Sequence, residues 1–276
     1  MTVVLTQENI IWTLWFQGED VAPFLVKESI RVWREKNPDF ELKVLTNENL
    51  HEYMDFSKED VLWITKLDYA PRSDLIRLYL LSRYGGVWAD PTTLCMKPLS
   101  QWLDLGDAGF FAFSKPGFDR ELSSWFMASK KNGYIITKMY ESYKNYWRKR
   151  AGHKLENHNS FVNTYLSHPR LQWIWFSWLG VLYKRYPYFS IHYMFGVMLK
   201  RDSHFRLLWR ESKKHSAVGP NMPAKTGMRK LINQEIIDLV NGTEPVLKMT
   251  WKGFDSDIAS DGNTVAGYIL GSLSRQ

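Results

Sequence analysis

The sequence contains a single cysteine, Cys95, among its 276 residues. One thiol excludes an internal disulfide and a cysteine-rich zinc site, and such scarcity is typical of proteins of the reducing cytosol. The first residues lack the basic-then-apolar order of a signal peptide, and no uncharged run approaches the roughly 20 residues that span a bilayer. We therefore expect a cytoplasmic protein whose contact with the plasma membrane is peripheral and at its inner face.

Sequence patterns typical of repeat proteins, nucleic-acid-binding proteins, glycan hydrolases and histidine-bound metal sites are also missing. No internal repeat, low-complexity tract or nucleic-acid motif is present, and the 36 basic residues are dispersed among 29 acidic ones. We can place no pair of facing carboxylates of the kind that a glycan hydrolase requires. Five histidines show no spacing typical of metal ligands: His153, His158, His168, His192 and His204. We therefore expect no nucleic-acid partner, no glycan hydrolysis and no histidine-bound metal.

The chain is rich, by contrast, in aromatic side chains and in positive charge. Aromatic residues make up 15% of the sequence, including 13 Trp, and the formal net charge is +7. Such rings often form surfaces that stack on rings, sugars or lipid interfaces, and a positive field attracts anions. A globular chain with an anionic partner is expected, such as a nucleotide diphosphate or an acidic lipid headgroup.

The order of predicted elements indicates the fold class. Along the first part of the chain, we predict strands at 10–16 and 40–45, helices at 24–37 and 47–54, then a helix through Asp74 and a strand from Val87. This alternation is typical of a mostly parallel α/β sheet with helices on its faces. Two further strands, at 110–114 and 125–128, are predicted to precede a helix at 133–150.

The region 155–210 interleaves aromatic with basic residues, and it admits two interpretations. In the first, it is an interfacial surface, with rings at the depth of lipid headgroups and cations on lipid phosphates. In the second, it is an ordinary helical layer that covers the sheet, since aromatic stripes at helical spacing usually belong to a core.

Residues 72–98 combine a charged helix, a glycine turn and a strand that ends in a carboxylate. Asp74 and Arg77 stand three residues apart, so both project from one face of the helix. There they either hold one polar ligand or form a surface ion pair. Gly85 and Gly86 are predicted to end the helix, because only glycine enters the left-handed conformation without a steric penalty.

Asp90 follows the predicted strand from Val87, at the carboxyl end where open α/β sheets bind ligands. Pro91 has no amide proton and ends the strand pairing. A carboxylate in this position either binds a hard cation such as Mg²⁺ or Mn²⁺, or caps a turn. Trp15, near the end of the first strand, either stacks on a ligand or fills the core.

Three stretches together resemble glycosyltransferase family 32, specifically its bacterial capsular polysaccharide synthesis branch. They are WTLWFQG at 12–18, SDLIRLYLLSRYGGVWAD at 73–90 and LKMTWK at 247–252. A more distant resemblance is to the large clostridial glucosylating toxins. The resemblance implies a GT-A fold, in which one Rossmann-like sheet binds a nucleotide sugar and a divalent metal. The aromatic region between these stretches matches no family that we can name.

The resemblance also implies roles for residues of a donor site. Trp15 corresponds to a tryptophan that stacks on the uracil ring, with Trp12 as its neighbour. Ser73, Asp74 and Arg77 correspond to a helix that contacts the donor sugar and diphosphate. These roles are chemically sensible, because Asp accepts hydrogen bonds from sugar hydroxyls and Arg offers planar donors to phosphate oxygens.

The implied metal site is Asp90 with Thr92, where many relatives carry Asp-x-Asp. A hydroxyl replaces the second carboxylate, so we expect a variant Mn²⁺ or Mg²⁺ site that binds its ion less tightly. Thr250, Trp251 and Lys252 correspond to a segment that closes over the diphosphate in relatives.

The implied reaction is retaining transfer of a hexose from a UDP-sugar to a hydroxyl of a growing capsular or other surface polysaccharide. Asp74 and Asp90 are the candidate catalytic residues, and Lys248 and Lys252 would supply positive charge for the leaving diphosphate. The expected acceptor is a lipid-linked glycan. The alternative is a non-catalytic, basic, aromatic-rich protein that binds anionic lipid or single-stranded nucleic acid.

These expectations divide the chain into three segments. Residues 1–130 are predicted to form the nucleotide-sugar-binding GT-A core, and residues 131–215 a helical, aromatic-rich insertion that faces the acceptor or the membrane. Residues 216–276 are predicted to return to the active site.

Overall fold

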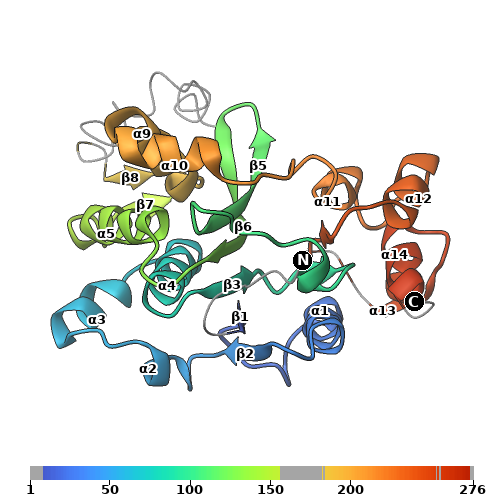
Figure 1. The fold of residues 1–276 in the computed structure, drawn as a ribbon. Coiled ribbons are helices and arrows are strands. Elements are labelled where there is room, and N and C mark those ends of the chain that lie inside the picture. The colour runs from blue at the N-terminus through green and yellow to red at the C-terminus, as the bar shows by residue number, and fades with distance from the viewer. Residues whose placement is uncertain (1–8, 156–181, 183, 253, 255, 274–276) are drawn as a thin grey trace. The chain divides into compact units, whose positions relative to one another are not determined.

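The computed structural model of the protein describes residues 9–155, 182, 184–252, 254 and 256–273. The chain divides into two compact units, and Figure 1 labels most of their helices and strands. Unit 1 comprises Met1–Leu50, Gly86–Asp104 and Ser216–Gln276, and unit 2 comprises His51–Gly85 and Leu105–His215. Each unit is therefore assembled from segments that are not contiguous in the sequence.

The centre of unit 1 is a parallel sheet. β1 (Ile10–Leu14) pairs in parallel with both β2 (Glu41–Leu45) and β3 (Gly86–Ala89). Trp12 of β1 lies opposite Trp88 of β3, which fixes the register of that pair. All residues of β1 are buried. A nearly continuous apolar sequence forms this strand because both of its faces are covered.

Helix α1 (Phe24–Lys36) connects β1 to β2, as a parallel pair requires. It begins after Pro23 and ends at Asn37. Its buried side chains recur at helical spacing: Leu25, Val26, Ser29, Ile30, Val32 and Trp33. The helix and the two strands predicted over residues 10–45 are therefore confirmed, with bounds that shift by one or two residues.

A two-stranded antiparallel sheet and short helices complete unit 1. The strands are β4 (Thr93–Cys95) and β9 (Val246–Lys248), and neither was predicted. Besides α1, the helices of unit 1 in the described residues are η1 (Leu99–Gln101), α11 (Met222–Thr226), α12 (Gln234–Asn241), α13 (Ser256–Ser260) and α14 (Val265–Leu273). Side chains from both strands and from α12 and α14 share one hydrophobic core, which includes Leu94, Leu247 and Ile269.

Unit 2 contains an antiparallel hairpin and several helices. The hairpin is β5 (Phe110–Gly117) with β6 (Arg120–Ser129), so the strands predicted at 110–114 and 125–128 are confirmed as parts of longer ones. The other elements in the described residues are α2 (Leu50–Tyr53), α3 (Lys58–Ile64), α4 (Tyr69–Arg83), α5 (Tyr134–Arg148), β7 (Lys154–Leu155), β8 (Arg185–Tyr186), α9 (Ser190–Arg201) and α10 (Ser203–Glu211). Helix α4 packs on α5, and α9 packs on β6.

The two glycines after α4 behave as predicted. The helix ends at Tyr84, and Gly85 and Gly86 follow with φ angles of 76° and 93°. A Cβ atom on Gly86 would lie 2.6 Å from the carbonyl oxygen of Ile10 in β1. Gly86 is therefore required both by its backbone conformation and by the close approach of the neighbouring strand.

The predicted fold class, an α/β protein with a parallel sheet and flanking helices, is confirmed. The two units divide the chain differently from the predicted segments 1–130, 131–215 and 216–276, and the functions assigned to those segments stay predictions. Within the described residues, no helix combines the length and the apolar character needed to cross a bilayer.

The aromatic region at 155–210 is only partly described. Trp173, Trp175, Phe176, Trp178 and Tyr183 lie outside the described residues. Of the described rings, Tyr186 is buried and donates a hydrogen bond to Asp68, whereas Tyr188 is exposed. The Phe189 ring lies 3.8 Å from the Arg120 guanidinium carbon. Some of the described aromatic rings in this region are therefore packed in the interior, and others lie at the surface.

Candidate functional site

The carboxyl ends of β1 and β3 lie at one edge of the parallel sheet in unit 1. Trp12 and Trp88 are opposite each other, so Trp15 and Asp90, three and two residues further on, both follow that edge. Ligands of open α/β sheets bind there, because the loops that leave the strands converge at this edge. The structure thus brings two of the predicted site residues to one end of one sheet.

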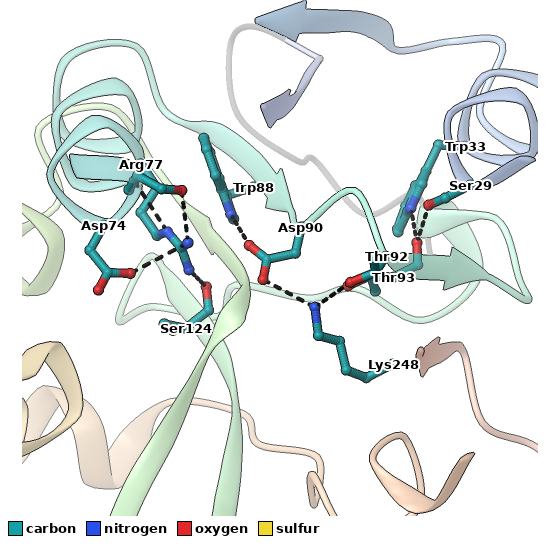
Figure 2. A network of polar contacts seen from close by, with 11 residues as sticks. Ser29, Trp33, Asp74, Arg77, Trp88, Asp90, Thr92, Thr93, Ser124 and Lys248 are labelled. Carbon is teal, nitrogen blue, oxygen red and sulfur yellow. Dashed lines mark hydrogen bonds and ion pairs between the residues drawn. The ribbon is translucent and has the colours of Figure 1, made fainter. Parts of the chain in front are cut away.

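Asp90 lies at the start of a tight turn that joins β3 to β4. The Thr93 amide donates to the Asp90 carbonyl oxygen at 2.8 Å, and Pro91 lies between them. The carboxylate is engaged on both oxygens: Trp88 Nε1 donates to Oδ1 at 2.9 Å, and Lys248 Nζ donates to Oδ2 at 3.1 Å. Both contacts are drawn in Figure 2, and together they orient the Asp90 carboxylate.

Lys248 links the two residues that were predicted to bind a metal. Its ammonium group donates to the Thr92 hydroxyl at 2.7 Å as well as to Asp90 (Figure 2). The side chains of Lys248 and Asp90 are 18% and 22% exposed, and Thr92 is buried. The cation and its partners are thus largely shielded from bulk water but not completely enclosed.

The backbone around Lys248 is held by strand pairing. Thr93 of β4 lies opposite Lys248 of β9. The next residue along, Met249, donates its amide to the Thr92 carbonyl oxygen at 2.8 Å. On the other side of the turn, Ser29 and Trp33 of α1 both donate to the Thr93 carbonyl oxygen, at 2.8 and 2.6 Å. The backbone of Lys248 and the turn that carries Asp90 and Thr92 are therefore both held in place, and the lysine side chain spans the distance between them.

An aromatic pair lies at the same edge of the sheet. The rings of Trp15 and Trp251 meet edge to face, with centroids 5.7 Å apart. Trp15 is half-buried and packs against the core of α1 around Val26 and Ile30, whereas 42% of Trp251 is exposed. Trp251 is therefore partly open to solvent, and Trp15 packs against it.

The other predicted donor-site residues of unit 1 differ in exposure. Thr250 is half-buried beside Trp251, and Lys252 is exposed. Trp12 is 1% exposed within β1. A ring that is covered so completely favours a packing role, and the alternation of side chains along a strand explains why it does not share the position of Trp15.

In unit 2, the predicted helix motif forms a buried polar network. Arg77 donates to the Ser124 carbonyl oxygen at 2.5 Å and to the Ser73 hydroxyl at 3.1 Å. Its guanidinium group also lies 3.4 Å from a carboxylate oxygen of Asp74. Asp74 and Arg77 are only 8% and 5% exposed, so the alternative of a surface ion pair was wrong.

Two residues that sequence reasoning missed complete this network. The Tyr143 hydroxyl of α5 lies 3.2 Å from Asp74 Oδ2, to which it donates, and 3.2 Å from the Ser190 hydroxyl of α9. Burial, followed by the negative charge of Asp74, raises the pKa of Tyr143 well above its ordinary value. Tyr143 therefore stays protonated and keeps a donor on Asp74. Only its place on the apolar face of a predicted helix was visible in the sequence.

The predicted site residues thus fall into two groups. Unit 1 holds Trp12, Trp15, Asp90, Thr92, Thr250, Trp251 and Lys252, and unit 2 holds Ser73, Asp74 and Arg77. Within unit 1, the structure adds the direct contacts of Lys248, whose charge alone was noticed in the sequence. The convergence of the two groups on one ligand stays a prediction.

The lone Cys95 has no place in this chemistry. It is buried, and its thiol contacts the Asn37 side chain and the Lys97 carbonyl oxygen. Burial raises the pKa of the thiol to about 12. The reactive thiolate form is therefore negligible at neutral pH.

The groups around Asp90 do not match a resident divalent metal ion. Mg²⁺ and Mn²⁺ are hard cations that need several oxygen ligands, at about 2.1 Å for Mg²⁺. Here both Asp90 oxygens and the Thr92 hydroxyl already accept hydrogen bonds, two of them from an ammonium cation. Among the described residues, no group of three or more His, Cys, Asp or Glu side chains could hold an ion. The Mn²⁺ or Mg²⁺ site stays a prediction, and the hydrogen bonds that Asp90 and Thr92 already accept do not favour it.

A family model described as capsular polysaccharide synthesis protein matches residues 3–179. The chain belongs to this family. The match includes both the Asp90 turn and the Asp74 helix, and it ends before Lys248. The family resemblance predicted from the sequence is thereby confirmed.

Comparison with individual proteins finds glycosyltransferases. This family member is 26% identical over 163 residues to O-glycosyltransferase braB of Annulohypoxylon truncatum, a match that covers 52% of this chain and 38% of that protein. The chain thus spans well under half the length of that relative.

Two solved structures are also similar. PaToxG glycosyltransferase has 18% identity and a TM-score of 0.40, over 85% of this chain and 84% of that one. A glycosyltransferase involved in the glycosylation of the major capsid of PBCV-1 has 11% identity and a TM-score of 0.32, over 64% of this chain and 80% of that one. Structural matches at this level support no conclusion about the present chain.

Proposed function

We propose that this capsular polysaccharide synthesis protein is a retaining glycosyltransferase that moves a hexose from a UDP-sugar to a hydroxyl of a growing surface polysaccharide. One feature of unit 1 supports the proposal: an exposed aromatic ring and a cation are close in the sequence, at the edge of the sheet where ligands of such folds bind. The ring is Trp251, which packs against Trp15, and the cation is Lys248, three residues before it. A nucleoside diphosphate needs a ring for its base and a cation for its phosphates.

The proposed reaction exchanges one bond at the anomeric carbon for another. The bond from this carbon to the UDP oxygen breaks, the bond to the acceptor oxygen forms, and the acceptor proton passes to the leaving diphosphate. No general acid is then required from the protein. Positive charge develops on the sugar, as in glycoside hydrolysis, while negative charge grows on the diphosphate. Fixed cations stabilise that growing charge in the transition state.

In this proposal, the side chains of unit 1 bind the nucleotide. Trp251 and Trp15 hold the uracil ring, and Lys248 and Lys252 face the diphosphate. Asp90 acts through Lys248, because its carboxylate holds the ammonium group in one orientation. Such preorganisation means that the charge need not be moved into place during the reaction.

The residues of unit 2 have a separate role in the proposal. Ser73, Asp74 and Arg77 would contact the donor sugar and its diphosphate. Support comes from the rigidity of their network, since Tyr143 and the Ser124 carbonyl fix the two charged side chains. A sugar hydroxyl would then meet a carboxylate that is already oriented to accept its hydrogen bond.

The acceptor in this proposal is a lipid-linked glycan at the cytoplasmic face of the plasma membrane, which the protein contacts peripherally. The net charge of +7 supports an approach to anionic lipid. The exposed side chains of Leu182, Lys184, Arg185 and Tyr188 supply apolar and basic groups close together in the sequence. This combination suits the boundary between headgroups and acyl chains.

Thermal unfolding with UDP tests the proposed donor site. UDP at about 100 times its Kd should stabilise the protein by roughly 2.7 kcal/mol. Trp251→Ala should reduce this effect, since stacking of a base on an aromatic ring contributes about 1–3 kcal/mol. Phe118→Ala removes another exposed ring, 86% accessible, to which the proposal gives no role, and should leave the UDP effect unchanged. A protein stabilised by anionic vesicles or oligonucleotides, but not by UDP, would be a binding protein instead.

A further inference from the structure

We infer that the Lys248 ammonium is the resident cation of the Asp90–Thr92 site, so that the protein binds the nucleotide diphosphate without a divalent metal ion. The inference rests on the proposed function, because it names how that same site holds the donor. The observation behind it is that Lys248 Nζ contacts both predicted metal ligands, at 3.1 Å from Asp90 Oδ2 and 2.7 Å from Thr92 Oγ1.

The ammonium group and a metal ion would compete for the same oxygen atoms. A metal bound to Asp90 Oδ2 and Thr92 Oγ1 would need to lie where Nζ now lies, or within a few ångströms of it. Two cations at that separation repel each other strongly in a partly buried site. The other oxygen of Asp90, Oδ1, already accepts the Trp88 indole N–H, which limits the directions from which a further ligand could approach it. A metal held by both Asp90 Oδ2 and Thr92 Oγ1 would therefore require the lysine to leave.

The backbone of Lys248 restricts how far its side chain can move away from Asp90 and Thr92. Its backbone is part of β9, and the residues on both sides of it, Leu247 and Met249, are buried in the hydrophobic core. The Lys248 amide donates to the Pro220 carbonyl oxygen at 2.7 Å. The stem of the side chain therefore starts from a fixed point opposite the turn, and only 18% of the side chain is exposed.

The chemistry of the donor fits a lysine in this position. An ammonium group is a compact point charge that binds phosphate oxygens through charge-assisted hydrogen bonds. Asp90 neutralises part of its charge in the free protein and keeps it aimed at the edge of the sheet. When the diphosphate enters, its negative charge attracts the same group. The missing second carboxylate at Thr92 is then explained, because one ammonium needs fewer anionic ligands than a divalent ion does.

Calorimetric titration of the full chain with UDP, in EDTA and then in Mn²⁺, tests this inference. The wild type should bind UDP in EDTA, and Mn²⁺ should change the Kd by less than about twofold. Mn²⁺ alone, followed by the electron paramagnetic resonance signal of the free ion, should show no binding. Lys248→Met should weaken UDP binding by about tenfold or more in EDTA, and Lys248→Arg, which keeps the charge, should restore part of the loss.

The control is Lys225→Met, which removes an exposed lysine of the same unit and should leave the Kd for UDP unchanged. If the wild type binds UDP only when Mn²⁺ is present, the inference is overturned while the proposed function stands. If it binds no UDP under either condition, both are overturned. A wild type that needs no metal, together with an unimpaired Lys248→Met, would also overturn the role of Lys248.

Discussion

Asp90 is the residue on which the contacts of the candidate site meet. It accepts one hydrogen bond from the strand before it, through Trp88, and one from a strand more than 150 residues later in the chain, through Lys248. Its carboxylate thus holds the Lys248 ammonium group in position, whichever ligand binds. The Thr93 amide contacts the backbone carbonyl of Asp90, so this bond of the turn does not use the carboxylate, which contacts Trp88 and Lys248 instead.

Asp90→Asn should reduce transfer from the sugar donor by about 100-fold or more, because the neutral amide no longer holds the Lys248 charge in place. The melting temperature should change little, since a partly exposed ion pair contributes only about 1 kcal/mol. Donor turnover and thermal unfolding of the same preparation measure both effects. Asp39→Asn, an exposed carboxylate in unit 1, is the matched control. Normal turnover by Asp90→Asn would remove Asp90 from the site.

Arg77→Ala should destabilise the protein by about 3 kcal/mol, because it leaves the Asp74 carboxylate buried without its cation. Tyr143→Phe, which removes only the hydroxyl on Asp74, should cost about 1 kcal/mol. Chemical denaturation measures both changes. An Arg77→Ala variant as stable as the wild type would mean that the network does not stabilise unit 2. Arg77→Lys is the better variant for donor titrations, because it keeps the buried charge.

At the scale of elements, local patterns were sufficient to predict α1, α4 and the three strands of the parallel sheet. Their apolar runs, helical spacing and glycine or proline boundaries act over a few neighbouring residues. β4 and β9 were missed because a strand of three residues is too short to show the alternation of apolar and polar side chains. Their pairing, and with it the contact of Lys248 with Asp90, depends on segments about 150 residues apart. The contact of Tyr143 with Asp74 was hidden for the same reason.

Gly86→Ala should destabilise the protein by about 2 kcal/mol or more, since the added methyl group meets the Ile10 carbonyl oxygen in addition to the unfavourable φ. Gly18→Ala is a matched control, because its φ of 95° is similar but nothing lies within 4 Å of the added atom. It should cost only about 1 kcal/mol. Equal losses in urea unfolding would show that the approach of β1 to β3 is looser than described.

The contact between α3 and α5 predicts a dependence on pH. Burial acts to raise the pKa of Asp60, but the hydrogen bonds from Lys144 and Trp63 outweigh it and leave the pKa below the ordinary 3.8. Because the folded-state pKa is depressed, this carboxylate stabilises the fold above pH 3.8. Its contribution is lost as the pH falls below 3.8 through the folded-state pKa.

Lys144→Met should therefore lower the free energy of unfolding by about 0.5–1 kcal/mol at pH 7, with a difference from the wild type that shrinks below pH 3.8. Lys138→Met removes a more exposed lysine from the same helix and should have little effect. Urea unfolding at a series of pH values measures both. A difference that stays constant down to pH 2 would exclude the ion pair as its cause.

At the scale of the whole molecule, the predicted site is distributed over two units. The α/β class and the family could be predicted, because the motifs that indicate them are contiguous in the sequence. The division after Leu50, Gly85, Asp104 and His215 could not be predicted, since it depends on contacts between segments that are separated in the sequence. The uracil, diphosphate and sugar contacts assigned to Trp15, Asp90 and Arg77 all require a nucleotide sugar, so one activity tests them together.

Release of UDP from a panel of UDP-hexoses, followed without an added acceptor, is the most direct test of the proposed function. A glycosyltransferase of this kind should hydrolyse at least one donor slowly, and Asp90→Asn should slow that reaction by about 100-fold or more. If no UDP-hexose is hydrolysed faster by the wild type than by Asp90→Asn, although both are folded, the protein is not the proposed hexosyltransferase.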